Sequence, residues 1–133
     1  MVRIIFVALL SLLASSCFTN SGAPPEDVDK AALQFFSRIK DADYNSVYDD
    51  AAAGFKKDKT RDDLVGNLTD LRSGGRLVGF SRLGTYFNNE GGKQVGVTTY
   101  LTQFERSKGE VKLFFVDESG EWKFSGFEFK PRT

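Results

Sequence analysis

Residues 111–129 read VKLFFVDESGEWKFSGFEF, and this stretch decides the fold. It contains two runs that are rich in β-branched and aromatic residues, 111–116 and 122–129, with the short segment DESG between them. Short connections that contain Gly, Asp or Ser between such runs are typical of β-hairpins. We therefore expect the C-terminal part of the chain to form an antiparallel hairpin.

The second run carries four aromatic residues whose spacing changes in the middle. Trp122 and Phe124 are two positions apart, and so are Phe127 and Phe129, but the two pairs differ in parity. Alternate residues of a regular strand point to opposite faces, so an unbroken strand would divide the four rings between both faces. A one-residue bulge at 125–126 would place all four on one face and bend the strand, and we predict that bulge.

Two further strand-like runs, 77–87 and 95–104, precede this hairpin and are separated by segments rich in Asn, Gly and Ser. Together the four runs predict a four-stranded antiparallel meander. Phe114 and Phe115 are adjacent in one run, so their rings must point to opposite faces of the sheet. We therefore expect a helix, a partner or a ligand to cover part of the second face, or that face to line a cavity.

The segment before the strands has the apolar spacing of amphipathic helices. Residues 26–40 follow two prolines, begin with two acids and repeat apolar residues every three or four positions, which predicts a first helix. We expect a second helix to begin after Asp43 as its N-cap and to end at Gly54. A third is expected to begin with a capping box formed by Thr60 and Asp63. Three helices before a meander predict the α+β class.

The first 16 residues have the composition of a signal peptide. Residues 4–14 form an apolar run of 11 residues that is too short for a permanent membrane-spanning helix. Small residues follow, and Cys17, the only cysteine of the chain, comes directly after them. This arrangement resembles the lipobox of bacterial lipoproteins, where a signal peptidase cuts before the cysteine and the thiol is acylated. The alternative is an ordinary secretory signal that is cut after Ser16 or Ala23.

The lipobox resemblance implies that lipid on Cys17 holds the protein at a membrane, because two or three acyl chains anchor stably. Phe18 rather than Asp follows the cysteine, which by analogy indicates the outer membrane, with the domain facing the periplasm. The alternative is a secreted or periplasmic protein. Residues 17–25 are interpreted as the lipidated cysteine and a tether, and residues 26–133 as a single domain.

Helices followed by a bent meander resemble the cone-shaped nuclear-transport-factor-2-like fold, which ketosteroid isomerase shares. A wider pattern also resembles a bacterial exported domain family of unknown function with that fold. It consists of Asp43, Tyr44 and Tyr48 in the second expected helix, Arg72 and Arg82 around the first strand, and the motif GxWKxxGF at 120–127. The resemblance implies a curved sheet that wraps the first helix. It implies no activity.

Composition excludes several classes of function. Lys and Arg total 18 and Asp and Glu total 18, so the formal net charge is zero and no nucleic acid partner is expected. The chain has no His and one Cys, so the commonest general base is missing and no Cys-based zinc site can form within it. Residues 41–45 have the first ligand spacing of an EF-hand, but Ser46 and Ala52 stand where that loop needs Gly and Glu. We expect helix capping there, and neither a metal nor a cofactor.

Three arginines, Arg72, Arg76 and Arg82, lie close together in the sequence at the expected junction of helix and sheet. They could form an anion or lipid-headgroup site through bidentate guanidinium contacts. The alternative, which we favour, is one charge at a helix C-terminus and two ion pairs with nearby acids. Residues 56–59 (KKDK) are interpreted as a solvated turn.

The catalytic site of ketosteroid isomerase needs an Asp base together with a Tyr and a protonated Asp. No Asp lies inside an apolar strand run of this chain. The sequence therefore predicts a non-catalytic, lipid-anchored envelope module that binds another envelope protein or an apolar small molecule through its aromatic sheet face. Two alternatives stay open: an enzyme or small-molecule-binding protein that uses a cone-shaped pocket, and a homodimer through the sheet. A cavity that holds a buried carboxylate near a Tyr would favour the enzyme, and a flat exposed Phe/Tyr patch would favour a partner or a dimer.

Overall fold

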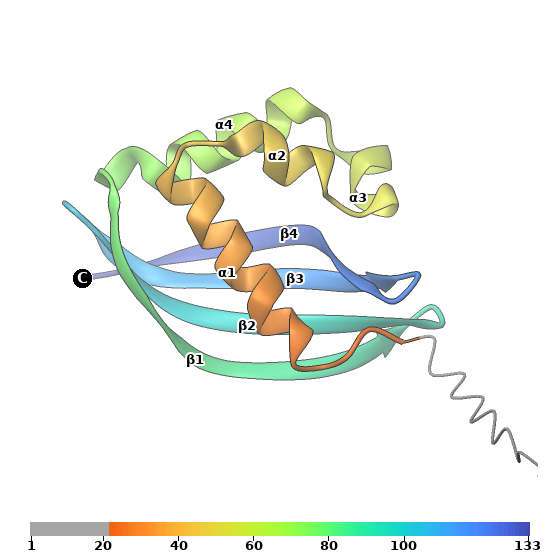
Figure 1. The fold of residues 1–133 in the computed structure, drawn as a ribbon. Coiled ribbons are helices and arrows are strands. Elements are labelled where there is room, and N and C mark those ends of the chain that lie inside the picture. The colour runs from red at the N-terminus through yellow and green to blue at the C-terminus, as the bar shows by residue number, and fades with distance from the viewer. Residues whose placement is uncertain (1–21) are drawn as a thin grey trace, which may run out of the picture.

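The computed structural model describes residues 22–133, in which helices precede strands along the chain (Figure 1). The helices are α1 (Asp27–Lys40), α2 (Tyr44–Asp49), α3 (Ala53–Asp58) and α4 (Arg61–Leu71), and the 3-10 turn η1 (Arg72–Gly74) follows them. The strands are β1 (Leu77–Glu90), β2 (Lys93–Phe104), β3 (Lys108–Glu118) and β4 (Glu121–Arg132). They form one antiparallel sheet in the order β1-β2-β3-β4, so the predicted α+β class and meander are confirmed.

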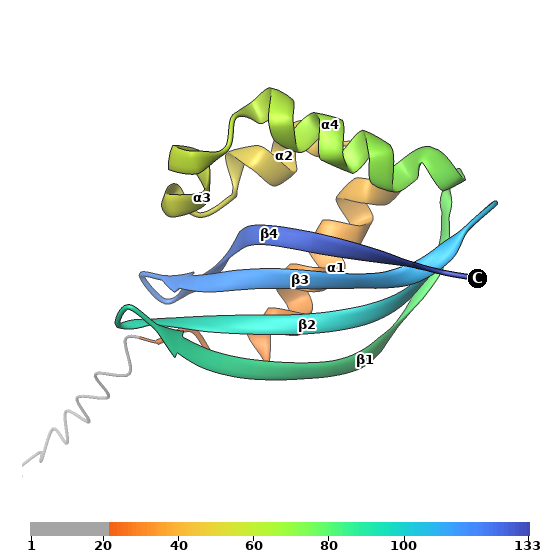
Figure 2. The same ribbon diagram turned by 180° about the vertical axis from the view of Figure 1, so that it is seen from behind.

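The two faces of the sheet differ in what covers them. α1 crosses one face, and α2, α3 and α4 lie beyond the β4 edge (Figure 1). From behind, no helix of the described residues lies over the opposite face (Figure 2). We call the side that α1 crosses the helix face and the other side the outer face.

The core forms between α1 and the helix face. Five apolar residues of α1 are at most 3% exposed, and they follow the three- and four-residue spacing of one helix face: Val28, Ala32, Phe35, Phe36 and Ile39. Their partners on the sheet include Tyr100, Val111, Leu113 and Phe115. Full burial of one Phe or Ile side chain contributes roughly 1.5–3 kcal/mol, so this layer carries much of the stability.

Two helices begin at the capping residues that the sequence predicts. The Asp43 side chain accepts a hydrogen bond from the Ser46 N–H at the start of α2. Before α4, Thr60 accepts from the Asp63 N–H at 3.1 Å and Asp63 accepts from the Thr60 N–H at 3.2 Å, which is a complete capping box. The Ser46 hydroxyl bond lowers the pKa of the Asp43 carboxyl, and the Thr60 N–H lowers the pKa of Asp63. Both predicted caps are confirmed.

The number of helices differs from the prediction, because four α-helices stand where three were expected. α2 ends at Asp49 rather than Gly54, and Gly54 lies inside the additional helix α3. The residues interpreted as a solvated turn, 56–59, form the last part and the C-cap of that helix. The cause is a long-range contact: Ala51 bridges to Phe124 of β4, and the neighbouring Ala52 N–H donates to the Phe124 carbonyl at 2.8 Å. The sheet edge thus interrupts the helix.

The predicted bulge in β4 is confirmed. The pairing of β3 with β4 steps from Gly126 to Phe124, which leaves Ser125 as the extra residue. Gly126 has φ 145°, a conformation that favours glycine. Phe124 and Phe127 both lie against Phe35 of α1, with ring centroids 5.5 and 6.2 Å away. The extra residue therefore allows the aromatic rings before and after the bulge to point to the helix face.

Candidate binding groove on the outer face of the sheet

An apolar row crosses the outer face. The register pairs Tyr86 of β1 with Val97 of β2, and Val97 with Phe114 of β3. Val95 and Val116 pair in the next row. Val97 is only 3% exposed although no described helix covers it, because its larger neighbours flank it on both sides. The second sheet face is therefore apolar, as the adjacent rings Phe114 and Phe115 imply.

These side chains form the floor of a groove of about 430 Å³. Its size falls in the range of small-molecule sites. Three charged residues, Glu90, Lys93 and Glu118, line it at the end of the sheet where the β1–β2 and β3–β4 turns lie. We call this the turn end. Three further lining residues, Ala52, Gly54 and Phe55, come from α3 and the residue before it.

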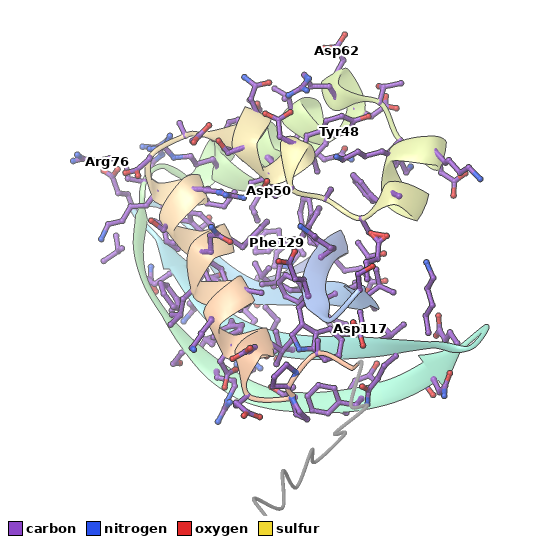
Figure 3. All side chains as sticks on the ribbon, turned by 45° about the vertical axis from the view of Figure 1, so that its right-hand side comes forward. Tyr48, Asp50, Asp62, Arg76, Asp117 and Phe129 are labelled. Atoms are coloured by element: carbon purple, nitrogen blue, oxygen red, sulfur yellow. The ribbon has the colours of Figure 1, made fainter. Side chains whose placement is uncertain are left out.

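The helix that the sequence prediction missed supplies one wall of this groove. The Ala53 N–H donates to both carboxylate oxygens of Glu118, at 2.9 and 3.2 Å, and so ties the start of α3 to β3. The Phe55 ring packs against Phe124 with centroids 5.4 Å apart. Tyr48 supports the wall from α2, as its hydroxyl donates to a backbone carbonyl at the end of α3 at 3.1 Å (Figure 3). The wall is thus fixed by packing and hydrogen bonds.

The β4 bulge keeps the groove open beside Phe114. Phe114 pairs with Gly126, which has no side chain, and Ser125 lines the groove instead. A Cβ atom built on Gly126 would meet no atom within 4 Å. The same feature that turns the aromatic rings of β4 inward therefore leaves free space on the outer face.

The groove offers a ligand an apolar floor, with charge at one end. Its two carboxylates are Glu90 and Glu118, and Glu118 is already engaged by the Ala53 N–H. Lys93 pairs with Glu90 across the β1–β2 turn. An elongated apolar molecule with a polar end would fit this distribution.

A second hollow of about 300 Å³ lies between α1, α2 and β4. Phe35, Trp122 and Phe124 line it, and Arg38 and Asp50 stand at its side (Figure 3 labels Asp50). The Arg38 guanidinium donates to the Asp50 carboxylate and, at 3.0 Å, to a carbonyl of α2. Arg38 and Asp50 thus bond each other, so this hollow offers a ligand fewer free polar groups than the groove does.

The three arginines contact different parts of the fold. Arg76, which projects from the molecule in Figure 3, bonds Glu105 through both its backbone N–H (2.8 Å) and its Nε (3.2 Å). Arg82 pairs with Asp29 of α1 at 2.6 Å. The Nε of Arg72 is buried without a hydrogen-bond partner. Two of the three thus form the ion pairs that we favour, and the anion site stays a prediction.

One Tyr does lie beside a carboxylate, but on the helix face. The Tyr100 hydroxyl donates to Asp29 at 3.5 Å, and burial raises the pKa of Tyr100 above its ordinary value of 10.0. The Asp29 side chain is 39% exposed and is paired with Arg82. A carboxyl that acts as an acid near neutral pH needs an apolar enclosure, and Asp29 lacks one.

Residues 22–133 hold no group of three or more His, Cys, Asp or Glu residues placed to bind a metal ion. In the segment 41–45, where EF-hand spacing occurs, Asp43 caps α2. None of the helices in this part of the chain is both long and apolar enough to span a membrane.

Cys17 and the predicted signal peptide lie outside the described residues. Where the description begins, the Ala23 N–H donates to Asp117 at 2.9 Å, and the Trp122 indole N–H donates to the Pro24 carbonyl at 2.8 Å (Asp117 is labelled in Figure 3). The chain therefore joins the domain on the helix face, at the turn end.

Comparison with known protein families and with curated proteins finds no match to this chain. The residues that sequence reasoning missed are those of the α3 wall, and the only local signal for them is the run of small residues from Ala51 to Gly54. Such a run allows the backbone to lie close to a sheet edge, but it does not specify which strand it will contact.

Proposed function

We propose that this domain is a non-catalytic binding module that holds an apolar ligand in the outer-face groove, and that lipid on Cys17 keeps it at a membrane. The observation that carries the binding role is the groove of about 430 Å³. Its floor of Tyr86, Val97 and Phe114 lies on the opposite side of the sheet from the core. Folding alone does not require an apolar floor there, whereas ligand binding does.

The proposed ligand is an elongated small molecule with an apolar body and a polar end. The body would lie along the rows of Tyr86, Val97 and Phe114 and of Val95 and Val116, where the apolar surface is continuous. The polar end would meet the charged residues at the turn end. With the anchor attached at that same end, the proposed placement is in the envelope, on the periplasmic side of the outer membrane.

We further propose that the fold belongs to the cone-shaped nuclear-transport-factor-2-like type. Support comes from the order of the elements and from the bulges that bend the sheet, which are in β1 after Leu77 and Arg82 and in β4 at Ser125. The proposed ligand groove lies on the outside of this cone, whereas the isomerase-type pocket lies inside it.

A paramagnetic fatty acid such as doxyl-stearate tests the groove by NMR. We expect it to broaden the amide signals of Val95, Val97 and Phe114. In a matched pair of variants, Val116→Glu places a charge in the floor, whereas Lys112→Glu changes the same face outside the lining. A carboxylate on the floor would lose water when the apolar body of the ligand covers it, so Val116→Glu should weaken binding about tenfold or more, and Lys112→Glu less than about twofold. Equal binding by both variants, or broadening confined to the second hollow, would contradict the groove.

The membrane anchor needs a separate test, because Cys17 lies outside the described residues. The full chain should fractionate with membranes and carry a mass increase of attached acyl chains, whereas Cys17→Ser should carry none. If both fractionate alike as soluble proteins, the anchor is wrong. That result would leave the groove untouched.

A further inference from the structure

β1 is an edge strand with an unusual surface. It pairs with β2 only, so its other edge is free within the described residues. Six large apolar side chains of this part of the chain are exposed, and all except Leu33 lie on β1: Val78, Phe80, Leu83, Tyr86 and Phe87. Natural sheets usually protect a free edge with charges, proline, bulges or a covering segment. β1 has bulges after Leu77 and Arg82, but residues 84–90 continue without a bulge and carry one charge, Glu90. This part of the edge is suited to pairing with another strand.

The β1–β2 turn shows which backbone groups point toward the free edge. Gly91 and Gly92 have φ 57° and 80°, which is the pattern of a two-residue type I′ turn. The turn bond makes Glu90 and Lys93 a hydrogen-bonded pair. Such pairs alternate along an antiparallel ladder, so every second residue of β1 directs its N–H and carbonyl away from β2.

Counting back from Glu90, the residues with outward backbone groups are Thr85, Phe87 and Asn89. A local contact agrees with this assignment: the Asn89 N–H donates to the side-chain oxygen of Asn88 at 2.9 Å rather than to β2. A partner strand would have to replace this side-chain acceptor with its own carbonyl. A row of alternating donors and acceptors is best matched by another backbone in extended conformation.

We propose that a second copy of this chain pairs antiparallel with β1 across residues 84–90, with a twofold axis at Phe87. Phe87 then lies opposite the partner's Phe87, and Thr85 lies opposite the partner's Asn89. Every pair that exchanges hydrogen bonds in this register consists of residues whose backbone groups already point outward. The two sheets join into one.

The side chains of this segment suit pairing with themselves. Glu90 is the only charged residue between 84 and 90, and it falls opposite the partner's Gly84, so no like charges meet. On the outer face, Tyr86 lies beside the partner's Asn88, which can accept its hydroxyl or cover its ring. On the helix face, the two Phe87 rings meet at the axis, where each is 38% exposed in a single copy.

The position of the chain start is compatible with this pairing. A twofold axis perpendicular to the sheet keeps both α1 helices, and both chain starts, on the same side. The Phe87 ring lies 5.7 Å from Trp122, whose indole holds Pro24, so each chain start lies near the axis. Two anchors on Cys17 could then reach one membrane. This compatibility rests on the proposed function, whereas the pairing itself does not.

The second copy would also add to the groove. Tyr86 and Asn88 line it from β1, so the partner's Asn88 would stand beside Tyr86 at its open side. The grooves of both copies would then face each other across the joined strands. Pairing would thereby enlarge the apolar binding surface beyond that of a single chain.

Disulfide cross-linking of the full chain in membranes tests the register. In Phe87→Cys the two Cα atoms lie about 5.5 Å apart, within the range of a disulfide. In the matched control Thr85→Cys, on the same face, the two cysteines are offset by four residues, or about 13 Å, and cannot join. We expect a reducible dimer for the first variant and none for the second. The unchanged chain shows any dimer that Cys17 itself forms.

A double variant keeps the test decisive if Phe87→Cys fails to fold. When Thr85→Cys and Asn89→Cys are combined, Cys at position 85 of one copy lies opposite Cys at position 89 of the other. The double variant should therefore cross-link, although each single variant should not. Only monomers in both designs, or equal cross-linking by Thr85→Cys alone, would overturn the proposal. Binding of doxyl-stearate to the uncross-linked variants separates the two proposals, because the groove of one copy needs no partner.

Discussion

The two edges of this sheet are built in opposite ways. β4 is covered where Ala51 and Ala52 pair with Phe124, and its far end carries Pro131 between the charged residues Lys130 and Arg132. β1 has no such cover within the described residues and exposes five large apolar side chains. β1 carries bulges after Leu77 and Arg82, but residues 84–90 have neither a bulge nor a covering segment among the described residues. This stretch is the part of the sheet edge that the proposed pairing would cover.

The largest effect is expected where β4 meets the core. Phe124 is 6% exposed and stacks on Phe35, so Phe124→Ala should lower the free energy of unfolding by about 3–5 kcal/mol. Phe87→Ala on β1 removes the same atoms from a ring that is 38% exposed, and should lower it by roughly 1 kcal/mol. Urea denaturation followed by circular dichroism measures both. Equal losses of unfolding free energy would show that Phe87 of β1 is packed as deeply as Phe124 of β4. The two edges would then not differ in this respect.

A smaller effect is expected from uncovering β4. Ala52 has φ −59°, which proline can adopt, so Ala52→Pro removes the N–H that donates to Phe124 and also adds ring atoms at a residue that is 1% exposed. Leaving the Phe124 carbonyl without its donor should lower the free energy of unfolding by about 1–3 kcal/mol. The control Gly54→Ala adds a methyl group where no atom lies within 4 Å. Denaturation curves of the two variants should differ, and coincident curves would mean that the contact with β4 contributes nothing.

β1 should tolerate a change that β4 would not. Tyr86 is 54% exposed, so Tyr86→Lys should change the free energy of unfolding by no more than about 0.5 kcal/mol at low protein concentration. Thermal denaturation at several concentrations measures this. A loss above about 2 kcal/mol at every concentration would mean that Tyr86 is buried within a single chain. The β1 edge would then not be free.

The parts of the fold that the sequence predicted depend on local patterns. The Asp43 cap, the Thr60 capping box and the bulge at 125–126 each involve residues within a few positions of one another. Parity and spacing along the chain therefore suffice to predict them.

The parts that sequence reasoning missed depend on contacts between distant residues. α3 is separate from α2 because Ala52 bonds Phe124, 72 positions away, and Asp29 meets Arg82 because α1 crosses the sheet beside β1. Nothing in the residues around Ala52 or Asp29 specifies these partners. The α3 wall of the groove therefore could not be predicted from the sequence, although the apolar floor could be inferred from the adjacent residues Phe114 and Phe115.

The smallest expected effect on stability concerns the start of β1, where the Glu105 side chain accepts a backbone hydrogen bond. The Arg76 N–H donates to Glu105 at 2.8 Å, and this bond lowers the pKa of the Glu105 carboxyl below its ordinary value of 4.5. A lowered pKa means that the contact stabilises the fold above pH 4.5 and is lost as the pH falls through the lowered value. The Arg76 amide proton should therefore titrate in NMR spectra with a midpoint below 4.5, and in Glu105→Gln it should not titrate. A midpoint at or above 4.5 would show that the Glu105 carboxylate does not support the start of β1, which would then depend on its pairing with β2 alone.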